Sequence, residues 1–369
     1  MKRICIDIRH LTSNPSGVGR YIKNLAEQLL RMKITNQRYY LLGQKDNFAR
    51  LEIDPALYTP LEAPYPAEKH PLSDIWFNTF FFSLMKKNQI QIFHSTAFIA
   101  PYRKGPFALI TTIHDFVYKT YPATLPATFR YFLNSQVKTA VKNSRALIVM
   151  SNFIKNQLEK YFNSPPPVRV IPLGCTQTRV VPQKGETLPC SPYMLFVGNI
   201  EPRKGIPDLI RGYEMYRQKN PSSRLNLVIC GQTLWNYDLP RKMASQSVYK
   251  NSIFFTGYVP EEQLEKYYAH SVLTVIPSHY EGFGLPVLEA LRASAPILVN
   301  DIAPLTETGG NWVTRVNITS ETELAQKIDF LTEHSPSNPS RAHQYQFLLT
   351  KYSWEQCAKN TAQLYEEIN

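Results

Sequence analysis

The clearest chemical pattern lies late in the chain, directly after an apolar run. It reads Pro277-Ser278-His279-Tyr280-Glu281-Gly282-Phe283-Gly284-Leu285-Pro286-Val287-Leu288-Glu289-Ala290. Gly284 lets the backbone come close to a ligand, and Pro286 suits the first turn of a helix. Free amides at that helix start favour an anion, while the carboxylates of Glu281 and Glu289 can accept hydrogen bonds from hydroxyl groups. A capping glutamate in an ordinary loop would look similar, but the loop, the preceding strand and both glutamates together favour a nucleotide-sugar site.

A second pattern, at an earlier strand–loop–helix junction, is basic. It reads Gly198-Asn199-Ile200-Glu201-Pro202-Arg203-Lys204-Gly205. Arg203 offers a forked, bidentate contact and Lys204 a point charge, so the pair can neutralise a diphosphate. Taken alone, the segment is equally well explained as an exposed basic turn.

Two weaker patterns lie in the first half of the chain. Gly17 and Gly19 belong to Ser16-Gly17-Val18-Gly19-Arg20, a shortened phosphate loop that lacks the full GxGxxG fingerprint, and a tight turn would also explain them. His114 and Asp115 follow an apolar run, at the carboxyl end of a predicted strand, where a site of the first half would lie. A histidine that simply caps the strand is the ordinary alternative there.

The sequence argues against several other classes of protein. It has no His/Glu cluster with metal-ligand spacing, so we predict no metal site and no zinc hydrolase. It has no G-x-S-x-G motif, which argues against an α/β-hydrolase. The five cysteines include no CxxC pair and indicate a reducing cytoplasm. The start of the chain alternates with charge, unlike a signal peptide, and no run approaches the ~20 apolar residues that cross a bilayer.

The net charge of +12 favours an anionic partner. Nucleotide phosphates, nucleic acid and acidic membrane surfaces all fit that charge. We do not expect nucleic acid, because the basic residues are spread along the chain and no zinc or RNA-recognition signature is present. A protein that is merely basic is an equally good explanation of the charge.

Short apolar runs alternate with stretches of helical period on both sides of an irregular segment. We predict strands at 3–8, 39–42, 90–93, 108–113, 146–150 and 168–171, then at 193–197, 224–230, 252–255, 272–276 and 296–299. Helices are expected after the first glycine turn and near 74–87, 126–143, 205–219, 261–269, 285–293 and 353–368. The segment 176–192 has no periodicity and is the predicted linker.

This order of elements predicts an α/β fold with two doubly wound domains, each built on a parallel sheet covered by helices. The first domain would span residues 1–180 and the second residues 190–350. Ligands of such folds bind at the carboxyl ends of the strands, so the expected site is the cleft between the two domains.

Taken in this order, the four patterns resemble glycosyltransferase family 4, whose members have the GT-B fold. The resemblance covers nearly the whole chain, and its most specific part is Glu281-x7-Glu289 within Glu-Gly-Phe-Gly-Leu-Pro-x-x-Glu. It implies two Rossmann-like doubly wound domains facing a deep cleft, and a C-terminal crossover helix, residues 353–369, on the first domain. One departure is Thr306-Glu307-Thr308-Gly309-Gly310-Asn311-Trp312, where the family often has Pro-Glu-x-x-Gly-Asp-Ala.

The resemblance implies roles for individual residues. Arg203 and Lys204 would bind the diphosphate and stabilise the leaving group. Glu289 would bind the ribose and Glu281 the donor sugar, with His114 near the anomeric carbon. The implied catalytic set is therefore His114, Glu281, Arg203 and Lys204. The implied donor-binding set is Gly17, Gly19, Gly198, Arg203, Lys204, Pro277, Glu281, Gly282, Phe283, Gly284, Leu285 and Glu289.

The resemblance also implies the reaction. A hexose would be transferred with retention of anomeric configuration, by attack on the face from which the nucleotide leaves, with no metal and no cofactor. UDP-glucose is the favoured donor and GDP-mannose the next. The acceptor would be a glycan or lipid-linked glycan of cell-envelope or extracellular polysaccharide.

We expect a cytoplasmic protein with peripheral contact to the inner face of the cell membrane. The aromatic run 76–87 and the segment 130–142 are the candidates for this contact. A core helix that packs on the sheet is the better explanation of residues 76–85.

Other functions remain open on the sequence. A nucleotide-sugar epimerase on the same fold would need acid and base groups around the sugar and no acceptor. A non-catalytic nucleotide-sugar-binding protein would bind the donor without turnover. For a transferase, we expect Glu281→Ala and Lys204→Ala each to lower turnover and to leave the fold intact.

Overall fold

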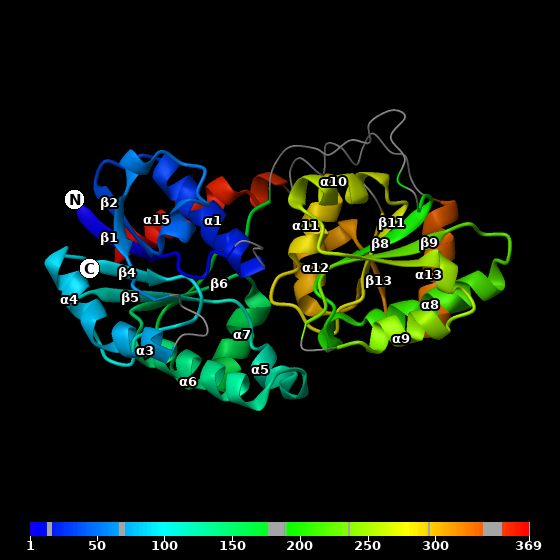
Figure 1. Ribbon diagram of the computed structural model, residues 1–369, viewed down its shortest axis with the longest axis horizontal. Helices are drawn as coiled ribbons and strands as arrows, with labels where there is room; N and C mark the ends of the chain where they lie inside the picture. Colours follow the sequence, from blue (N-terminus) through cyan, green and yellow to red (C-terminus); the bar gives the residue numbers. More distant parts are fainter. Residues whose placement is uncertain are drawn as a thin grey trace. The chain divides into compact units, whose positions relative to one another are not determined.

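The chain forms two compact units (Figure 1). The computed structural model describes residues 1–12, 17–65, 71–175, 188, 190–234, 237–293, 296–334 and 349–368. The first unit contains residues 1–119, 127–174 and 352–369, and the second contains residues 120–126 and 175–351. The expected return of the C-terminal helix to the first domain is thereby confirmed. Most of the predicted linker, 176–192, lies outside the described residues.

Among the described residues, the first unit has a sheet of seven strands in the order β3-β2-β1-β4-β5-β6-β7, with every pair parallel. The strands are β1 (Lys2–Asp7), β2 (Gln37–Gly43), β3 (Thr59–Glu62), β4 (Ile92–Ser95), β5 (Ala108–Ile113), β6 (Ala146–Val149) and β7 (Val168–Val170). Strands β4 and β6, neither of which is an edge strand, are buried throughout, because helices cover both faces of a parallel sheet. The direction of winding reverses between β1 and β4.

The helices of the first unit are amphipathic and bury one face against this sheet. They are α1 (Gly17–Arg31), α2 (Lys45–Phe48), α3 (Pro71–Asn78), α4 (Phe80–Lys87), α5 (Val117–Thr120), α6 (Ala127–Asn143), α7 (Asn152–Tyr161) and α15 (Trp354–Glu367). The predicted face of α1 is confirmed, since Tyr21, Leu25 and Leu29 are all buried. Helix α15 packs against α1.

Both ends of α15 are capped by side chains. At its start, the hydroxyl of Ser353 accepts a hydrogen bond from the amide of Gln356. At its end, Nζ of Lys2 donates to the carbonyl oxygens of Tyr365, Glu366 and Ile368 at 3.0, 2.7 and 2.9 Å. A lysine that satisfies the last carbonyls of a helix also complements its dipole, so Lys2 fixes α15 beside the N-terminal strand β1.

The described part of the second unit repeats this plan with six parallel strands in the order β10-β9-β8-β11-β12-β13. The strands are β8 (Tyr193–Val197), β9 (Asn226–Cys230), β10 (Ile253–Gly257), β11 (Leu273–Ile276), β12 (Ile297–Asn300) and β13 (Thr314–Val316). The helices are α8 (Ile206–Lys219), α9 (Leu239–Gln246), α10 (Glu261–His270), α11 (Leu285–Arg292), α12 (Ala303–Gly309) and α13 (Glu321–Glu333). Here the winding reverses between β8 and β11.

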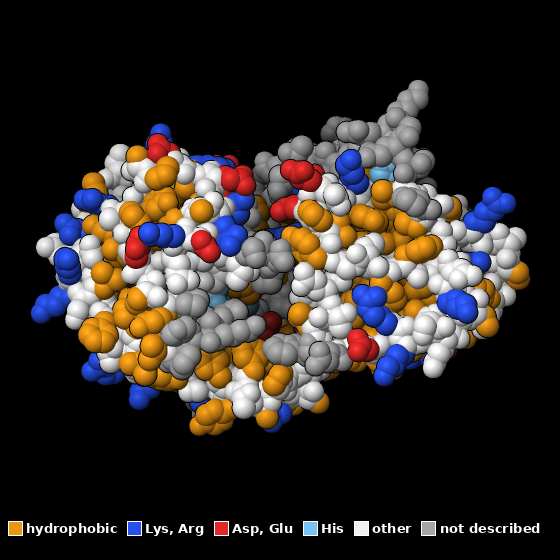
Figure 2. Space-filling model, in the orientation of Figure 1, with side chains coloured by type: hydrophobic (Ala, Val, Ile, Leu, Met, Phe, Trp, Pro, Cys, Tyr) orange, Lys and Arg blue, Asp and Glu red, His pale blue; other side chains and the backbone are white. Residues whose placement is uncertain are grey.

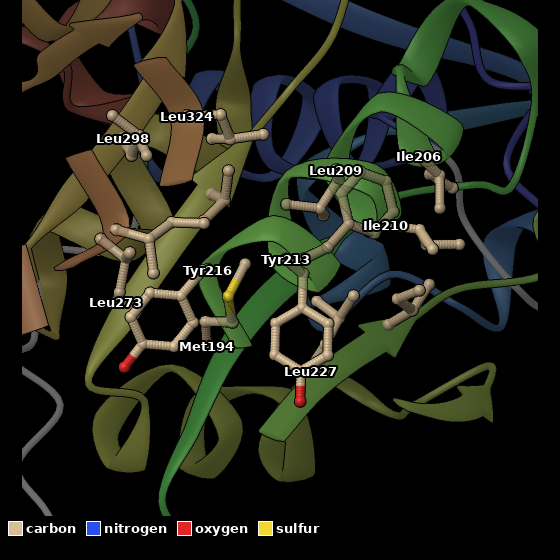
Figure 3. Close-up of a cluster of buried hydrophobic side chains, with 14 of the residues drawn as sticks. Met194, Ile206, Leu209, Ile210, Tyr213, Tyr216, Leu227, Leu273, Leu298 and Leu324 are labelled. Carbon is tan, nitrogen blue, oxygen red and sulfur yellow. The ribbon is translucent and has the colours of Figure 1, made fainter. Parts of the chain in front are cut away.

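The core of the second unit lies between this sheet and two long helices. Leu209 and Tyr213 of α8 meet Leu324 of α13 and Leu227 of β9, as Figure 3 shows. The same cluster includes Leu273 of β11, and all five side chains are fully buried. Burying a leucine contributes about 1.5–3 kcal/mol, so the cluster holds α8 and α13 firmly against the strands.

The predicted α/β fold with two doubly wound domains is confirmed. Two strands were missed, and both are edge strands: β3 contains Pro60, which an edge strand tolerates, and β13 has only three residues. The single helix expected near 74–87 is two helices, α3 and α4, interrupted at Thr79. Helices α2, α5, α7, α9, α12 and α13 were not predicted.

Candidate functional site

The two strongest sequence patterns meet at the switch point of the second unit. The loop after β8 carries Arg203 and Lys204, and the loop after β11 carries Glu281. Strands β8 and β11 are hydrogen-bonded neighbours and run parallel, so their carboxyl ends lie side by side. A point where the strand order reverses is where open α/β sheets bind ligands.

The two basic side chains hold the carboxylate of Glu281 from both sides. Nζ of Lys204 lies 2.6 Å from Oε1, and Nη1 of Arg203 lies 3.2 Å from Oε2. The hydroxyl of Ser278 donates to Oε1 at 2.7 Å. A carboxylate has about four lone-pair sites. Because Lys204, Arg203 and Ser278 occupy three of them, about one site on Glu281 remains for a further hydrogen bond.

This cluster is buried, which sets its charge state. Lys204 and Glu281 are each 7% exposed. Burial alone would raise the pKa of Glu281, but the charges of Lys204 and Arg203 and the hydrogen bonds from Lys204 and Ser278 outweigh it and hold the pKa at about 2. Glu281 is therefore ionised at neutral pH.

A second carboxylate makes the cluster electrically balanced. Nη2 of Arg203 lies 2.8 Å from Oε1 of Glu201, which is also buried. Two cations and two carboxylates carry no net formal charge. A diphosphate at this site would therefore be held by directed hydrogen bonds and not by a large surplus of positive charge.

The burial of the cluster changes one expectation. Removing Lys204 or Glu281 alone leaves an uncompensated buried charge, which costs about 3–5 kcal/mol. The expectation that Glu281→Ala and Lys204→Ala leave the fold intact is therefore replaced: we now expect both substitutions to lower the stability of the second unit.

Backbone contacts lock the two loops together. The amide of His279 donates to the carbonyl oxygen of Arg203 at 2.8 Å, and Nη1 of Arg203 donates to the carbonyl oxygen of Tyr280 at 2.9 Å. Gly205 has φ +65°, and a Cβ atom there would lie 2.0 Å from the carbonyl oxygen of Pro277. Only glycine combines this left-handed conformation with so close an approach.

The loop of Gly282, Phe283 and Gly284 continues into α11, which begins at Leu285 as predicted. Gly284 has φ +97°, and a Cβ atom there would meet Leu305 of α12 at 2.8 Å. The carbonyl oxygen of Phe283 accepts a hydrogen bond from Thr308 at 2.6 Å. Helix α12, which overlaps the segment that departs from the family pattern, thus supports this loop directly.

Glu289 lies one helical turn into α11 and is not part of the charge cluster. The hydroxyl of Tyr268 donates to its Oε2 at 2.8 Å. Gly198 follows β8 and lies beside the Lys204 side chain, since a Cβ atom at Gly198 would come within 3.8 Å of Nζ. Gly198 and Glu289 therefore both lie on the side of the sheet where the strands end. Glu289 contacts Tyr268, whereas Gly198 lies beside Lys204.

Several supporting residues were not predicted. They are Glu201, Ser278, Thr308, Asn300, whose side-chain amide donates to the carbonyl oxygen of Ser278, and Asp208, which pairs with Nε2 of His279 at 2.8 Å. Tyr121 donates to the carbonyl oxygen of His279 at 3.2 Å and packs on Tyr280. Glu201 and Ser278 stood within the two patterns, so a search for partners of Arg203 and Glu281 could have found them. No sequence signal pointed to the others.

His114, in the first unit, is a buried and neutral histidine. Its Nε2 lies 2.7 Å from the carbonyl oxygen of Thr96, which can only accept, so Nε2 carries the proton and Nδ1 is an acceptor. Burial lowers the pKa of His114 to about 4. The ring also meets Tyr21 and Phe98 edge-on, with ring centroids 5.3 and 6.0 Å apart.

Gly17 and Gly19 begin α1, after the carboxyl end of β1. Gly17 is exposed, with nothing within 4 Å of an added Cβ atom, and Gly19 is buried. The preceding residue of the pattern, Ser16, lies outside the described residues. Gly17, Gly19 and His114 thus all stand at carboxyl ends of strands in the first unit.

No group of three or more His, Cys, Asp or Glu side chains within the described residues is arranged to hold a metal ion. In the same residues, no helix is long and apolar enough to cross a membrane. All five cysteines are free and buried.

Two family descriptions match the chain in succession. "Glycosyltransferase Family 4" matches residues 15–179, and "Glycosyl transferases group 1" matches residues 182–349. The boundary between the two matches lies within the predicted linker. Between them they contain every residue of the predicted catalytic and donor-binding sets.

Curated relatives match over part of their length. O-antigen chain mannosyltransferase B of Escherichia coli is 26% identical over 251 residues, which is 66% of this chain and 63% of that protein. O-antigen chain mannosyltransferase RfbU of Salmonella typhimurium is 27% identical over 238 residues, or 63% of each chain. The chain thus spans just under two thirds of these relatives.

Among solved structures, sucrose-phosphate synthase from Thermosynechococcus elongatus has a similar fold. The TM-score is 0.76 at 19% identity, and the match covers 100% of this chain and 99% of that one. The similarity supports the GT-B architecture of two Rossmann-like units.

Proposed function

This chain belongs to glycosyltransferase family 4, and on that premise we propose that it transfers a hexose from a nucleotide-diphosphate sugar to a glycan or lipid-linked acceptor. The observation that carries the proposal is the buried cluster of Arg203, Lys204 and Glu281 at the carboxyl ends of β8 and β11. Its cations are held in place before any ligand arrives, so they can stabilise developing negative charge without reorganising.

We assign the roles as follows. Arg203 and Lys204 contact the diphosphate, and the amides around Phe283 and Leu285 assist them. Glu281 keeps both cations oriented and offers its remaining lone pair to a hydroxyl of the donor sugar. Glu289, oriented by Tyr268, accepts from the ribose hydroxyls.

We further propose that transfer retains the anomeric configuration. As the bond from C1 to the diphosphate oxygen breaks, the acceptor hydroxyl attacks C1 on the same face, and the departing phosphate takes its proton. The neutral Nδ1 acceptor of His114 suits a sugar hydroxyl and not a phosphate. Because Arg203 and Lys204 supply the positive charge, we expect EDTA to leave the rate unchanged.

The donor sugar is a glucosyl or mannosyl group. The resemblance to the family implies UDP-glucose first and GDP-mannose next. Two of the sequence relatives, which match 66% and 63% of this chain, are named mannosyltransferases, and their names support a mannosyl donor, such as GDP-mannose, as the first to test. Their names also support an acceptor in a cell-surface polysaccharide.

We also propose contact between the first unit and an anionic membrane surface. Between Ile75 and Arg145 the sequence has nine lysines and arginines and one acidic residue, Asp115. Phe80 and Tyr131 on α4 and α6 are 67% and 78% exposed. Figure 2 shows hydrophobic side chains gathered where Figure 1 places α3 and α6. The core-helix explanation also holds in part, since Phe77, Phe81 and Met85 are buried.

Sedimentation with vesicles tests the membrane contact. We expect binding to phosphatidylglycerol vesicles but not to phosphatidylcholine vesicles, and loss of binding in Phe80→Ser/Tyr131→Ser. Val248→Ser is the matched control, because Val248 is an 86% exposed apolar residue of the second unit. Equal sedimentation of all three proteins, or none with either lipid, would remove this contact.

A transfer assay tests the main function. Purified protein is incubated with GDP-mannose, UDP-glucose or other sugar nucleotides and a polyprenyl-linked saccharide, and the product is analysed by NMR. Transfer with an α-linked product from an α-linked donor supports a retaining transferase. Release of a sugar epimer, or binding of the donor without turnover, supports the epimerase or the non-catalytic alternative.

A further inference from the structure

Helix α15 inserts a tyrosine hydroxyl into the buried centre of the first unit. The hydroxyl of Tyr365 lies 2.6 Å from Nδ1 of His94 on β4, and both residues are completely buried. The two rings also meet edge-on, with centroids 5.8 Å apart. Tyr365 stands 271 residues after His94, so this contact joins the C-terminal helix to the first sheet.

The contact continues across the sheet to the first helix. Nε2 of His94 lies 2.8 Å from Oγ1 of Thr112 on β5, and the same oxygen lies 2.9 Å from the hydroxyl of Tyr21 on α1. Thr112 and Tyr21 are buried as well. One continuous chain of hydrogen bonds therefore connects α15, β4, β5 and α1.

The hydrogen-bonded network lies close to His114, both along the sequence and in contacts. Thr96, whose carbonyl oxygen accepts from Nε2 of His114, lies two residues after His94. Thr112 lies two residues before His114. Tyr21 holds Thr112 with its hydroxyl and packs its ring edge-on against His114. Two contacts of His114 are thus tied to the network, since Thr96 lies two residues from His94 and Tyr21 belongs to the network. The third is with the ring of Phe98, whose amide donates to the carbonyl oxygen of Thr112 at 3.0 Å.

A buried polar network is stable only where its hydrogen bonds are satisfied, a requirement that an apolar core would not have. Apolar side chains of similar volume at these four positions would be about as stable, because burying each polar group sacrifices its hydration. Burial also keeps His94 neutral, since it lowers the pKa of His94 to about 3. A neutral imidazole has one donor and one acceptor nitrogen, so it relays one defined direction of hydrogen bonding between its two partners.

We propose that Tyr365 is a positioning residue that acts through His94, Thr112 and Tyr21 to fix the orientation of the His114 ring. The crossover helix would then set the geometry of the first unit's candidate site and not merely cover the sheet. The expected effect on catalysis rests on the proposed function, because it assumes that His114 takes part in the transfer. The orientation of the ring is a property of the first unit alone.

The test uses Tyr365→Phe, which removes the hydroxyl and keeps the ring. The matched control is Thr361→Val on the same helix, because the Thr361 hydroxyl is equally buried but bonds only to Cys357 within the helix. A second variant, Thr112→Val, breaks the network at its centre, and Thr112→Ser restores the hydroxyl. The full-length protein is labelled with ¹⁵N-histidine, and His114→Gln assigns the His114 signals.

We expect Tyr365→Phe and Thr112→Val to shift the His114 ring signals and to lower kcat by about tenfold, with an unchanged Kd for the nucleotide. Thr361→Val and Thr112→Ser should keep the wild-type signals and kcat. Should Tyr365→Phe and Thr112→Val lower only the melting temperature, with His114 signals unchanged, the network is structural and the proposal is wrong. The ring signals decide this even in a protein without transferase activity, so failure of the proposed function is distinguished from failure of the network.

Discussion

At the scale of single residues, the second unit's site is governed by the cost of burying charge. Lys204 and Glu281 are buried and partly buried Arg203 lies beside them, so these charges are stabilised mainly by one another and by Glu201. The same arrangement that stabilises the apo site also orients its cations for an anionic ligand. Stability and binding are therefore coupled in these three side chains.

The first prediction separates the two roles. Lys204→Met should lower the free energy of unfolding of the second unit by about 3–5 kcal/mol, because it leaves Glu281 charged and buried. Adding Glu281→Leu should recover most of that loss, since an apolar pair can replace a buried ion pair. Urea unfolding of wild type, the single variant and the double variant measures both effects. Equal stability of wild type and Lys204→Met would show that the pair does not hold the loops.

The second prediction concerns Glu201, whose charge opposes an anionic ligand. Glu201→Gln keeps the shape and a hydrogen-bond acceptor for Arg203 but removes one negative charge. We expect the Kd for a nucleoside diphosphate to fall about fivefold, which corresponds to about 1 kcal/mol. Isothermal titration calorimetry measures it. A weaker or unchanged affinity would mean that the phosphate groups do not approach Arg203.

The residues of the cluster could be predicted from the sequence, but the balance of their charges could not. Arg203, Lys204 and Glu281 each had a motif around them. Pairing between them depends on the β8–β11 neighbourhood, which joins segments about 77 residues apart. The tautomer of His114 could not be predicted either. It depends on the carbonyl oxygen of Thr96, and a backbone group has no sequence signature.

At the scale of elements, the two motif loops touch through Gly205 and Pro277. We predict that Gly205→Ala lowers both the melting temperature and the affinity for the donor. An added Cβ atom would collide with the carbonyl oxygen of Pro277, and φ +65° itself costs a non-glycine residue about 1–2 kcal/mol.

Gly257→Ala provides the control for backbone strain. Gly257 has φ +73°, but nothing lies within 4 Å of an added Cβ atom. Thermal unfolding and a donor titration of both variants compare strain alone with strain plus collision. Equal effects of the two substitutions would show that the approach of Gly205 to Pro277 is unimportant.

The elements themselves followed from local patterns where those patterns were strong. The predicted strands 108–113 and 193–197 coincide with β5 and β8. All residues of β8 are apolar, and β5 is apolar except for its two threonines. Helix α13 was missed although Ser320 and Glu323 signal its start, and the Ser320 hydroxyl indeed accepts from the amide of Glu323. The edge strands β3 and β13 have half-exposed, mixed sequences that only their partners in the sheet make regular.

At the scale of the whole molecule, the two units should respond differently to acid. In the first unit, burial depresses the pKa values of His94 and His114 from 6.5 to about 3 and about 4. Below pH 6.5 the unfolded chain binds protons at these histidines while the folded unit does not. The free energy of unfolding therefore falls as the pH decreases from 6.5 towards these values. In the second unit, the pKa of Glu281 falls from 4.5 to about 2, so its contribution is lost only below about pH 4.5.

We therefore predict that the first unit loses stability between pH 6.5 and 4.5, before the second. Hydrogen exchange across this range should show faster exchange of amides in β4 and β5 while those of β8 and β11 remain protected. The second unit serves as the internal control in the same sample. Earlier opening of β8 and β11 would contradict the assigned origins of acid sensitivity.

The site at the carboxyl ends of β8 and β11 should bind the nucleotide of the donor through Arg203 and Lys204, and a binding assay can show whether it does. Wild type is titrated with UDP, GDP and ADP in a thermal-shift assay, beside Lys204→Met/Glu281→Leu, which is expected to keep the fold but lacks the Lys204–Glu281 ion pair. Arg241→Gln/Lys242→Met is the control, because it removes an adjacent Arg-Lys pair on α9 of the same unit. At a hundredfold excess over Kd, a bound nucleotide stabilises by about 2.7 kcal/mol. We predict such a shift with nucleotides of one base, retained in Arg241→Gln/Lys242→Met and lost in Lys204→Met/Glu281→Leu. No shift with any nucleotide, or an equal shift in Lys204→Met/Glu281→Leu, would show that this site does not bind the donor nucleotide.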